Sequence, residues 1–277
     1  DRSIHRGKIP GKPKDEGYKI WALAEHGFIY EFLWHSFAKG PQGLQDRWTA
    51  SKAKGGLDLS NTEAVVLELV DRLPQDSRHT VWLDNYFTSV RLLPQLRDQG
   101  VGAAGTVKNS QSTRIDPRLL DLRNQPKDKI DWGRLFAAVT TDGKVLQLGW
   151  KDSVLVLFMT TAFTGKETIE KVRKCPRDTP KATRALYVDS ILKLIIIPLL
   201  VELYNHCMNG VDLADQARCY YNTHRRHLKS WKPLWHFLMD MAVANVIRLI
   251  QLALSKQVDR RATRNKLISR YSSEADA

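Results

Sequence analysis

The sequence has 277 residues and a mass of 31.7 kDa, with 43% hydrophobic and 26% charged residues, the ordinary proportions of a chain that buries a core. These values exclude a fibre, a low-complexity linker and a disordered tail. The most apolar run, residues 191–201, contains Lys193 and Pro198 and is far too short to span a bilayer, so no membrane partner is expected. The cysteines show no CxxC spacing, which argues against a zinc ribbon or a disulfide framework.

The positive charge is concentrated in two parts of the chain. The sequence holds 43 Lys and Arg against 30 Asp and Glu, a net charge of +13. Residues 216–277 carry 12 basic and 4 acidic side chains, and residues 166–193 carry 8 and 4. A localised basic surface attracts nucleic-acid phosphates, although a solvated face of an ordinary protein has the same composition. Charge alone therefore suggests a nucleic-acid partner, and an ordinary solvated surface stays an alternative.

A β-hairpin and a helix are predicted in the first part of the chain. Residues 17–24 and residues 28–34 are rich in aromatic and aliphatic side chains and are joined by a turn that contains Gly27. Apolar residues at helical spacing follow Asn61, which we expect to be the N-cap, and Pro74 stops the run.

Strands and helices then alternate. We expect a strand at 80–83, a helix at 89–100 and a strand at 101–107, which together predict a mixed α/β core. Residues 136–160 read as a β-meander. Two helices follow, the second of them over residues 231–254, and its broadly apolar sequence predicts that it is largely buried.

Acidic residues at the ends of predicted elements are the candidates for chemistry. Asp84 follows a short apolar strand, at the edge where ligands of α/β sheets usually bind. Asp212 and Asp215 lie three residues apart, a spacing that puts both on one face of a helix. Each also has an ordinary explanation, because Asp-Asn is common in turns and Asp is favoured in the first turn of a helix. The spacing alone does not separate a metal site from these structural roles.

Several motifs occur in an order that is characteristic of one protein family. They are Asp-Asn-Tyr-Phe-Thr-Ser at 84–89, Gly-Thr-Val-Lys at 105–108, Tyr-Asn-His-Cys-Met-Asn-Gly-Val-Asp-Leu-Ala-Asp-Gln at 204–216, Trp-Lys-Pro-Leu from Trp231, and Asn245. They resemble the catalytic-domain motifs of the piggyBac transposase family, and the resemblance runs nearly end to end.

The resemblance implies an RNase H-like core that cuts and joins DNA with divalent metal ions, Mg²⁺ or Mn²⁺ as its substitute. Asp84 matches the second metal-binding Asp of the family, Asp212 the third, and Asp215 the acid that often follows it. Carboxylate oxygens are the ligands that Mg²⁺ prefers, and two such ions can hold the attacking and leaving oxygens of an in-line displacement.

The first metal-binding acid departs from the family pattern. The family has an Asp at the end of its first strand, where this chain has Glu25. Glutamate keeps the charge but moves the carboxylate by roughly 1.5 Å, and misplacement of about that size can cost on the order of 100-fold in rate. Glu25 therefore has three interpretations: a working metal ligand, a ligand in an impaired site, or a solvated hairpin charge.

Basic and aromatic residues near the motifs are candidates for DNA contact. They are Lys108, Arg225, Arg226, Lys229 and Trp231. The basic side chains could meet phosphates, and Trp231 matches a family tryptophan at the cleaved DNA end, where it could stack on an unpaired base. A solvated Lys108 and a Trp231 packed into the core stay open as alternatives.

The predicted fold class is α/β: an RNase H-like mixed sheet flanked by helices, with a β-rich insertion between the second and third catalytic acids. The predicted parts are 1–107 for the first part of the core, 108–200 for the insertion and basic linker, 201–256 for the helical second part, and 257–277 for a basic tail. The N-terminal region and Cys/His zinc module of the family are missing, so we expect a catalytic-domain fragment.

The leading hypothesis is a DNA transposase acting as a polynucleotidyl transferase. Its partners would be double-stranded DNA, with transposon ends and a TTAA-like target implied by the resemblance, and a second copy in a homodimer, because two ends must be cut together. Its expected location is the nucleus. The alternative is a domesticated, catalytically impaired DNA-binding protein, favoured by Glu25 and opposed by the three retained aspartates. A repair or RNA-processing nuclease of the same fold is a weaker third hypothesis.

Overall fold

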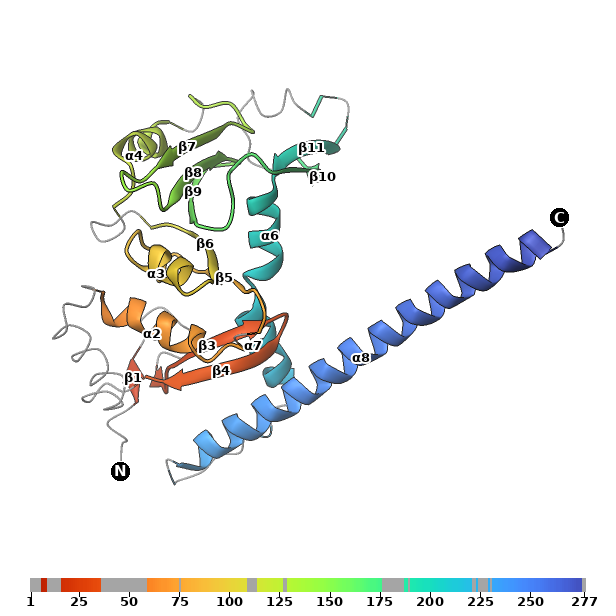
Figure 1. Ribbon diagram of the computed structural model, residues 1–277. Helices are drawn as coiled ribbons and strands as arrows, with labels where there is room; N and C mark the ends of the chain where they lie inside the picture. Colours follow the sequence, from red (N-terminus) through yellow and green to blue (C-terminus); the bar gives the residue numbers. More distant parts are fainter. Residues whose placement is uncertain are drawn as a thin grey trace. The chain divides into compact units, whose positions relative to one another are not determined.

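The computed structural model describes residues 6–8, 16–35, 59–74, 76–108, 114–126, 129–175, 187–188, 190–220, 223, 229 and 231–275, with side chains as far as Ser255. The chain divides into two compact units. The hairpin unit contains residues 1–38 and 209–277, and the sheet unit contains residues 39–208. Figure 1 shows the elements of both.

The hairpin unit is built on the predicted antiparallel pair of strands. β3 (Ile20–Glu25) pairs with β4 (Phe28–Trp34), and Glu25 lies opposite Phe28. His26 and Gly27 form the two-residue turn with φ of 46° and 90°. Positive φ at both positions is the geometry of the type I′ turns that suit the twist of a hairpin, which explains the glycine. A second, very short pair joins β1 (Gly7–Lys8) to β2 (Glu16–Gly17).

Two helices pack on this hairpin. α7 (Gly210–Tyr220) contacts β3 and β4, and α8 (Trp231–Ala275) contacts β4 and α7. Phe237 of α8 makes edge-on ring contacts with Phe32 and Trp34 of β4. The aromatic side chains that mark the second strand in the sequence therefore form the surface on which α8 packs.

The prediction that the long helix is largely buried is wrong. Only 17% of the most apolar window within Trp231–Ser255 is buried, although this segment is long and apolar enough to cross a membrane by length and composition alone. The reason is that the helix is apolar on more than one side, while its partners among the described residues, β4 and α7, cover one side. The helix also continues through the predicted basic tail to Ala275.

The sheet unit contains a five-stranded mixed sheet in the order β5-β6-β9-β8-β7. β5 (Thr80–Leu83) and β6 (Gly102–Thr106) are parallel. The predicted meander appears as β7 (Leu135–Val139), β8 (Leu146–Lys151) and β9 (Leu155–Thr160), all antiparallel. β9 pairs with β6, so the meander and the parallel strands share one sheet. The α/β class and the mixed sheet are confirmed, whereas the RNase H-like detail and the predicted boundaries of the insertion stay predictions.

Helices cover this sheet on both faces. α6 (Leu199–Cys207) packs with Leu200, Val201 and Tyr204 on a buried cluster that includes Leu148 of β8. The adjacent Gly149 faces the other way, where a Leu side chain of α4 (Pro117–Asn124) lies against it. α3 (Leu92–Asp98) contacts β6, and its leucines are fully buried. Figure 1 shows α3 and α4 on the side of the sheet away from α6.

The helix predicted from Asn61 is α2 (Asn61–Val70), but its N-cap is Ser60. The Ser60 hydroxyl accepts from the backbone N–H of Glu63, and the Glu63 carboxylate accepts from the backbone N–H of Ser60 at 2.6 Å. This reciprocal pair satisfies two backbone donors at the helix start, which neither Asn61 nor a single cap would do.

A further hairpin was not expected from the sequence. β10 (Thr168–Lys174) pairs antiparallel with β11 (Leu192–Pro198). Ile197 is fully buried in the cluster against α6, while Leu194 and Ile196 are mostly exposed. The charged residues of β10 gave no apolar alternation by which the strand could be recognised.

Candidate active site

Glu25 is the last residue of β3, and its carboxylate is held by a neighbouring tyrosine. The Tyr30 hydroxyl donates to Oε2 of Glu25 at 3.0 Å. Partial burial raises the pKa of Tyr30, and the hydrogen bond with Glu25 and its negative charge act in the same direction. Both side chains are exposed to solvent. The carboxylate at the predicted first metal position is therefore oriented and reachable.

The start of α7 lies against the end of β3. A Cβ atom on Gly210 would be 2.6 Å from the carbonyl oxygen of Ala24 and 3.4 Å from the backbone nitrogen of Glu25. No side chain fits at the first distance, so only glycine permits this approach. Asp212 lies in the first turn of α7, where the positive end of the helix dipole favours a carboxylate. The fold thus brings the backbone segments that carry Glu25 and Asp212 together.

The turn of the hairpin supports the same contact. A Cβ on Gly27 would be 3.3 Å from Cβ of Leu213 and 3.6 Å from the backbone nitrogen of Ala214. Ala214 is buried there, while Asp212 is exposed. The buried side of α7 therefore faces the hairpin and leaves Asp212 exposed.

Asp215 has a different environment from Asp212. Its Oδ1 accepts from the guanidinium of Arg218, one turn further along α7, at 2.9 Å from Nη2. The Arg218 guanidinium also lies 5.0 Å from the ring centre of Phe237. Asp215 thus has a cationic partner, whereas Glu25 and Asp212 have none among the residues that the structure describes.

Asp84 follows β5 at the carboxyl edge of the parallel pair in the sheet unit. Its backbone carbonyl accepts from the backbone N–H groups of Phe87 and Thr88 and from the Thr88 hydroxyl, and its Oδ1 accepts from the N–H of Asn85 at 2.5 Å. Asp84 is therefore both a turn residue, as one interpretation of the sequence held, and an exposed carboxylate at the predicted edge.

The loop after Asp84 is held against β6. A Cβ on Gly105 would lie 2.2 Å from the Thr88 hydroxyl and 2.5 Å from the carbonyl oxygen of Leu83. Only glycine at position 105 therefore lets the loop come this close to β6. Beside it, burial raises the pKa of Tyr204, and the charge of Asp84 adds to the effect. The Tyr204 hydroxyl lies 2.9 Å from that of Thr106. The glycine of the Gly-Thr-Val-Lys motif therefore has a structural role next to Asp84.

The predicted ligands offer the right chemistry for Mg²⁺. All four are carboxylates, and hard cations prefer oxygen ligands. Within the described part of the chain, no three His, Cys, Asp or Glu side chains gather as a metal site. Asp84 belongs to the sheet unit, whereas Glu25, Asp212 and Asp215 belong to the hairpin unit. The donor set fits the ion, and its assembly stays a prediction.

Three of the five predicted DNA contacts lie among the described residues. Lys108 is exposed just after β6, at the same edge as Asp84, and Lys229 is exposed before α8. Trp231 begins α8 with 57% of its surface exposed, which does not fit a role in the core. Arg225 and Arg226 lie outside the described residues.

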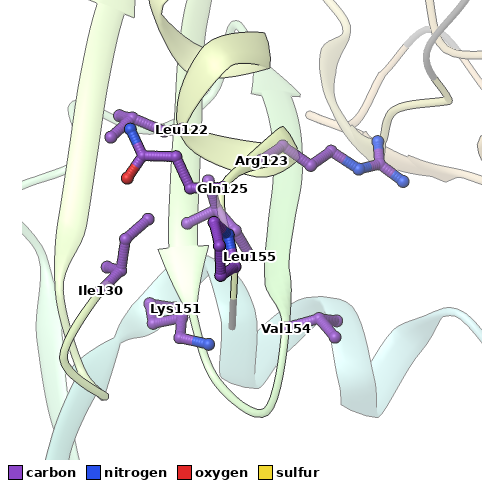
Figure 2. Close-up of a pocket in the computed structure, with 8 residues that line it drawn as sticks. Leu122, Arg123, Gln125, Ile130, Lys151, Val154 and Leu155 are labelled. Atoms are coloured by element: carbon purple, nitrogen blue, oxygen red, sulfur yellow. The ribbon is translucent and has the colours of Figure 1, made fainter. Parts of the chain in front are cut away.

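A pocket of about 330 Å³ lies elsewhere, in the sheet unit. Its walls include Leu122, Ile130, Val154 and Leu155, with Arg123 and Lys151 as basic residues (Figure 2). None of the predicted acids lines it. The pocket is therefore not the candidate site, which is an exposed surface.

Sequence reasoning missed the residues that support the acids. Tyr30 and Gly27 lie within five residues of Glu25, so the sequence offered only proximity as a signal. Gly210 belongs to the quoted motif, but its backbone contact is with Ala24 of β3, far away in the sequence. Asn245 also belongs to the motif, and it bonds to Ile29 of β4, 216 positions away.

The chain matches a transposase family model and proteins derived from transposable elements. A model of DDE transposases, described as Transposase IS4, matches residues 4–246. The human PiggyBac transposable element-derived protein 2 is 28% identical over 98% of this chain, and the human PiggyBac transposable element-derived protein 3 is 26% identical over 95%. The matches cover 41% and 40% of those proteins, so this chain spans about two fifths of their length.

A solved structure has the same fold. It is the cryo-EM structure of a piggyBac transposase synaptic complex with hairpin DNA, at a TM-score of 0.61 and 20% identity, covering 88% of this chain and 43% of that one. At that identity the likeness shows the fold alone. With the family match over most of the chain, the resemblance predicted from the motifs is confirmed: the chain belongs to the DDE transposase family described as Transposase IS4, among relatives derived from piggyBac elements.

Proposed function

We propose that this chain is the catalytic part of a transposase that cuts and joins DNA with divalent metal ions. The observation that carries the proposal is the contact between Gly210 and Ala24, which brings the start of α7 to the end of β3. Two acids in the order of the family motif, Glu25 and Asp212, lie beside that contact, and Asp84 occupies the predicted strand end. Position 210 has to be glycine because α7 comes so close to β3. This close packing favours a built site over a chance pattern of acids.

The acids would serve the proposed reaction as metal ligands. Bound Mg²⁺ would supply charge neutralisation for the attacking and leaving oxygens of an in-line displacement. Glu25, Asp84 and Asp212 would hold it through carboxylate oxygens. The ion pair of Asp215 with Arg218 makes Asp215 the weakest candidate of the four, because a partnered carboxylate oxygen must exchange a guanidinium for a metal.

The surroundings of the acids suit a DNA substrate. Lys108 lies exposed at the edge that carries Asp84, where its ammonium could meet a phosphate. Trp231 is exposed and could stack on an unpaired base at the cut end. Transposon ends and a TTAA-like target as substrates, Mn²⁺ as a working substitute, a homodimer for paired cutting, and the nucleus as location all rest on the family and form part of the proposal.

A second candidate function is a transposase-derived protein that binds DNA without cutting it. The observation that favours it is Glu25 in place of the family's aspartate. The human relatives are named as transposable element-derived proteins, which is consistent with a chain that derives from a transposase and has lost its cutting activity. The basic segment with Arg225 and Arg226 would then supply the retained activity.

Metal-dependent nicking of duplex DNA tests the two candidates against each other. Purified native chain is incubated with Mn²⁺ beside Glu25→Asp, Asp84→Asn and Asp212→Asn. Nicking by the native chain that both Asn variants abolish supports the transposase. Nicking only after Glu25→Asp supports the impaired DNA-binding protein. Activity that survives in both Asn variants would remove these carboxylates from the site.

The DNA-binding candidate has its own test in the salt dependence of affinity. Replacing Arg225 and Arg226 together by Ala should reduce the slope of log K against log salt by about 2, because each lost phosphate contact removes about 0.9. An unchanged slope would take both residues off the interface.

A further inference from the structure

The carboxylate at position 25 is supported by its own side-chain partner. The Tyr30 hydroxyl donates to Oε2 of Glu25 at 3.0 Å across the end of the hairpin. This contact uses one oxygen and leaves Oε1 without a hydrogen-bond partner among the residues that the structure describes, so one carboxylate oxygen stays available. Because the donor is neutral, the charge of Glu25 is not cancelled, unlike that of Asp215 beside Arg218.

A β-bulge places the tyrosine there. Leu23 pairs with Glu31 and Ala24 pairs with Ile29, so Tyr30 is the extra residue of β4 with no partner in β3. Bulges re-aim side chains next to functional sites. Without the extra residue, the side chain at position 30 would follow the alternation of the strand instead of reaching back along the hairpin to the end of β3.

The ring and the backbone around Tyr30 are fixed by other contacts. Its ring meets that of Phe28 edge-on, with centres 5.0 Å apart. The residue before it, Ile29, is held on both backbone groups by the side chain of Asn245, at 2.9 Å each. The donor of the hydrogen bond is therefore rigid, and the longer, more flexible glutamate is the partner that it orders.

We propose that Tyr30 is a positioning residue that holds the Glu25 carboxylate for metal binding, and that this contact makes a glutamate workable where the family has an aspartate. The inference rests on the proposed function. A glutamate has one more rotatable bond than an aspartate, and a rigid donor at its end limits the positions that its carboxylate samples. Partners of this kind around metal ligands commonly change metal affinity by about 10-fold or more.

The aspartate background isolates this role. A side chain shortened by one methylene, as in Glu25→Asp, draws back from the Tyr30 hydroxyl. In that background, removal of the Tyr30 hydroxyl should cause no further loss of metal affinity. If Tyr30 had only a structural role in the hairpin, Tyr30→Phe would lower the metal affinity equally in both backgrounds, because the ring contact and the bulge are independent of residue 25.

The experiment measures Mn²⁺ affinity from the electron paramagnetic resonance signal of free Mn²⁺, with no DNA present. The whole chain is compared with Tyr30→Phe, Glu25→Asp and the double variant. Tyr30→Phe keeps the ring, and the exposed position makes folding safe, which the unfolding midpoint checks. Tyr220→Phe, a more exposed tyrosine on α7, is the matched control.

We expect Tyr30→Phe to weaken Mn²⁺ binding by about 10-fold in the native background and to have no effect beside Glu25→Asp. An equal loss in both backgrounds, or no loss in the native one, overturns the positioning role. Glu25→Gln and Asp212→Asn separate this failure from that of the proposed function. If they weaken binding while Tyr30→Phe does not, only the role of Tyr30 fails; if they too leave binding unchanged, both proposals fail.

Discussion

Asn245 of α8 makes both of its amide hydrogen bonds with a single residue of β4, Ile29. Its carbonyl oxygen accepts from the Ile29 N–H and its amino group donates to the Ile29 carbonyl, each at 2.9 Å. A primary amide carries its donor and its acceptor on separate atoms, so it can satisfy both backbone groups of one residue at once. The backbone of β4 beside the bulge is thereby satisfied by a helix that follows it by more than two hundred residues.

Replacing Asn245 by Asp should destabilise the protein by about 1–3 kcal/mol, since the carboxylate has no donor for the Ile29 carbonyl and places charge against it. Denaturant unfolding measures the loss. Gln251→Glu is the control, because it makes the same amide-to-carboxylate change on an exposed part of α8. Equal free energies of unfolding for the two variants would contradict the paired bonds.

Gly210→Ala should destabilise the hairpin unit by about 1–3 kcal/mol, because the added carbon meets the Ala24 carbonyl and α7 must move. Helix propensity acts in the opposite direction, as Ala is favoured over Gly by about 1 kcal/mol inside helices. Gly17→Ala is the matched control, since a Cβ there meets nothing within 4 Å. A Gly210→Ala variant as stable as the native chain would show that α7 does not approach β3 as described.

Glu63→Gln should cost the sheet unit about 3 kcal/mol, since hydrogen bonds to a buried charged group are worth about 1.5–3 kcal/mol. Glu63 is only 3% exposed and accepts from the Ser89 hydroxyl, from Arg91 at 3.1 Å and from the backbone N–H of Ser60. It therefore ties the start of α2 to the start of α3.

Glu68→Gln, in the same helix, provides the contrast. Glu68 pairs with Arg72 one turn later near the surface, and such pairs contribute about 0.5 kcal/mol or less. The comparison is read from denaturant unfolding of the two variants. Losses of similar size would mean that the buried contacts of Glu63 contribute no more than a surface pair.

Acid should weaken the start of α4 through Asp116. The hydrogen bond from the Arg118 side chain holds the pKa of Asp116 below its ordinary value. A carboxyl whose pKa is lower in the folded than in the unfolded state adds stability above its unfolded pKa, and this contribution is lost as the pH falls through the folded pKa. The loss should begin below about pH 4, the ordinary value for Asp.

Thermal unfolding from pH 6 down to pH 2 checks this, with the native chain beside Asp116→Asn. Asparagine keeps the cap of α4 but cannot titrate. The gap between the two unfolding midpoints should therefore narrow as the solution becomes acidic. A gap that stays constant over this range would mean that the charge of Asp116 contributes nothing.

Local sequence patterns predicted those elements whose signals are local. The turn at Gly27 and the alternation in β4 marked the first hairpin, and the strand over Thr80–Leu83 was placed correctly. The cap of α2 was misplaced by one residue, because Ser60 and Asn61 are both good caps and only the bond with Glu63 selects the serine.

The wrong or missing predictions concern elements whose environment depends on distant segments of the chain. The burial of α8 depended on partners that sequence periodicity does not reveal, and β10 carries too many charges to show an apolar face. In the candidate site, the motifs predicted which acids to examine. The contact of Gly210 with Ala24 joins segments that are far apart in the sequence, and no pattern within either segment specifies it.

The exposed apolar side chains of α8 also affect how this protein behaves in a test tube. Met239, Val246, Leu249 and Ile250 are all at least 43% exposed, on a chain whose net charge is +13. Like charges keep copies apart at low ionic strength, and salt screens that repulsion within about 10 Å at 0.1 M. Raising the salt would therefore weaken the proposed DNA binding and favour self-association of the protein at the same time. Light scattering beside every salt titration would keep colloidal behaviour from being mistaken for a change in affinity.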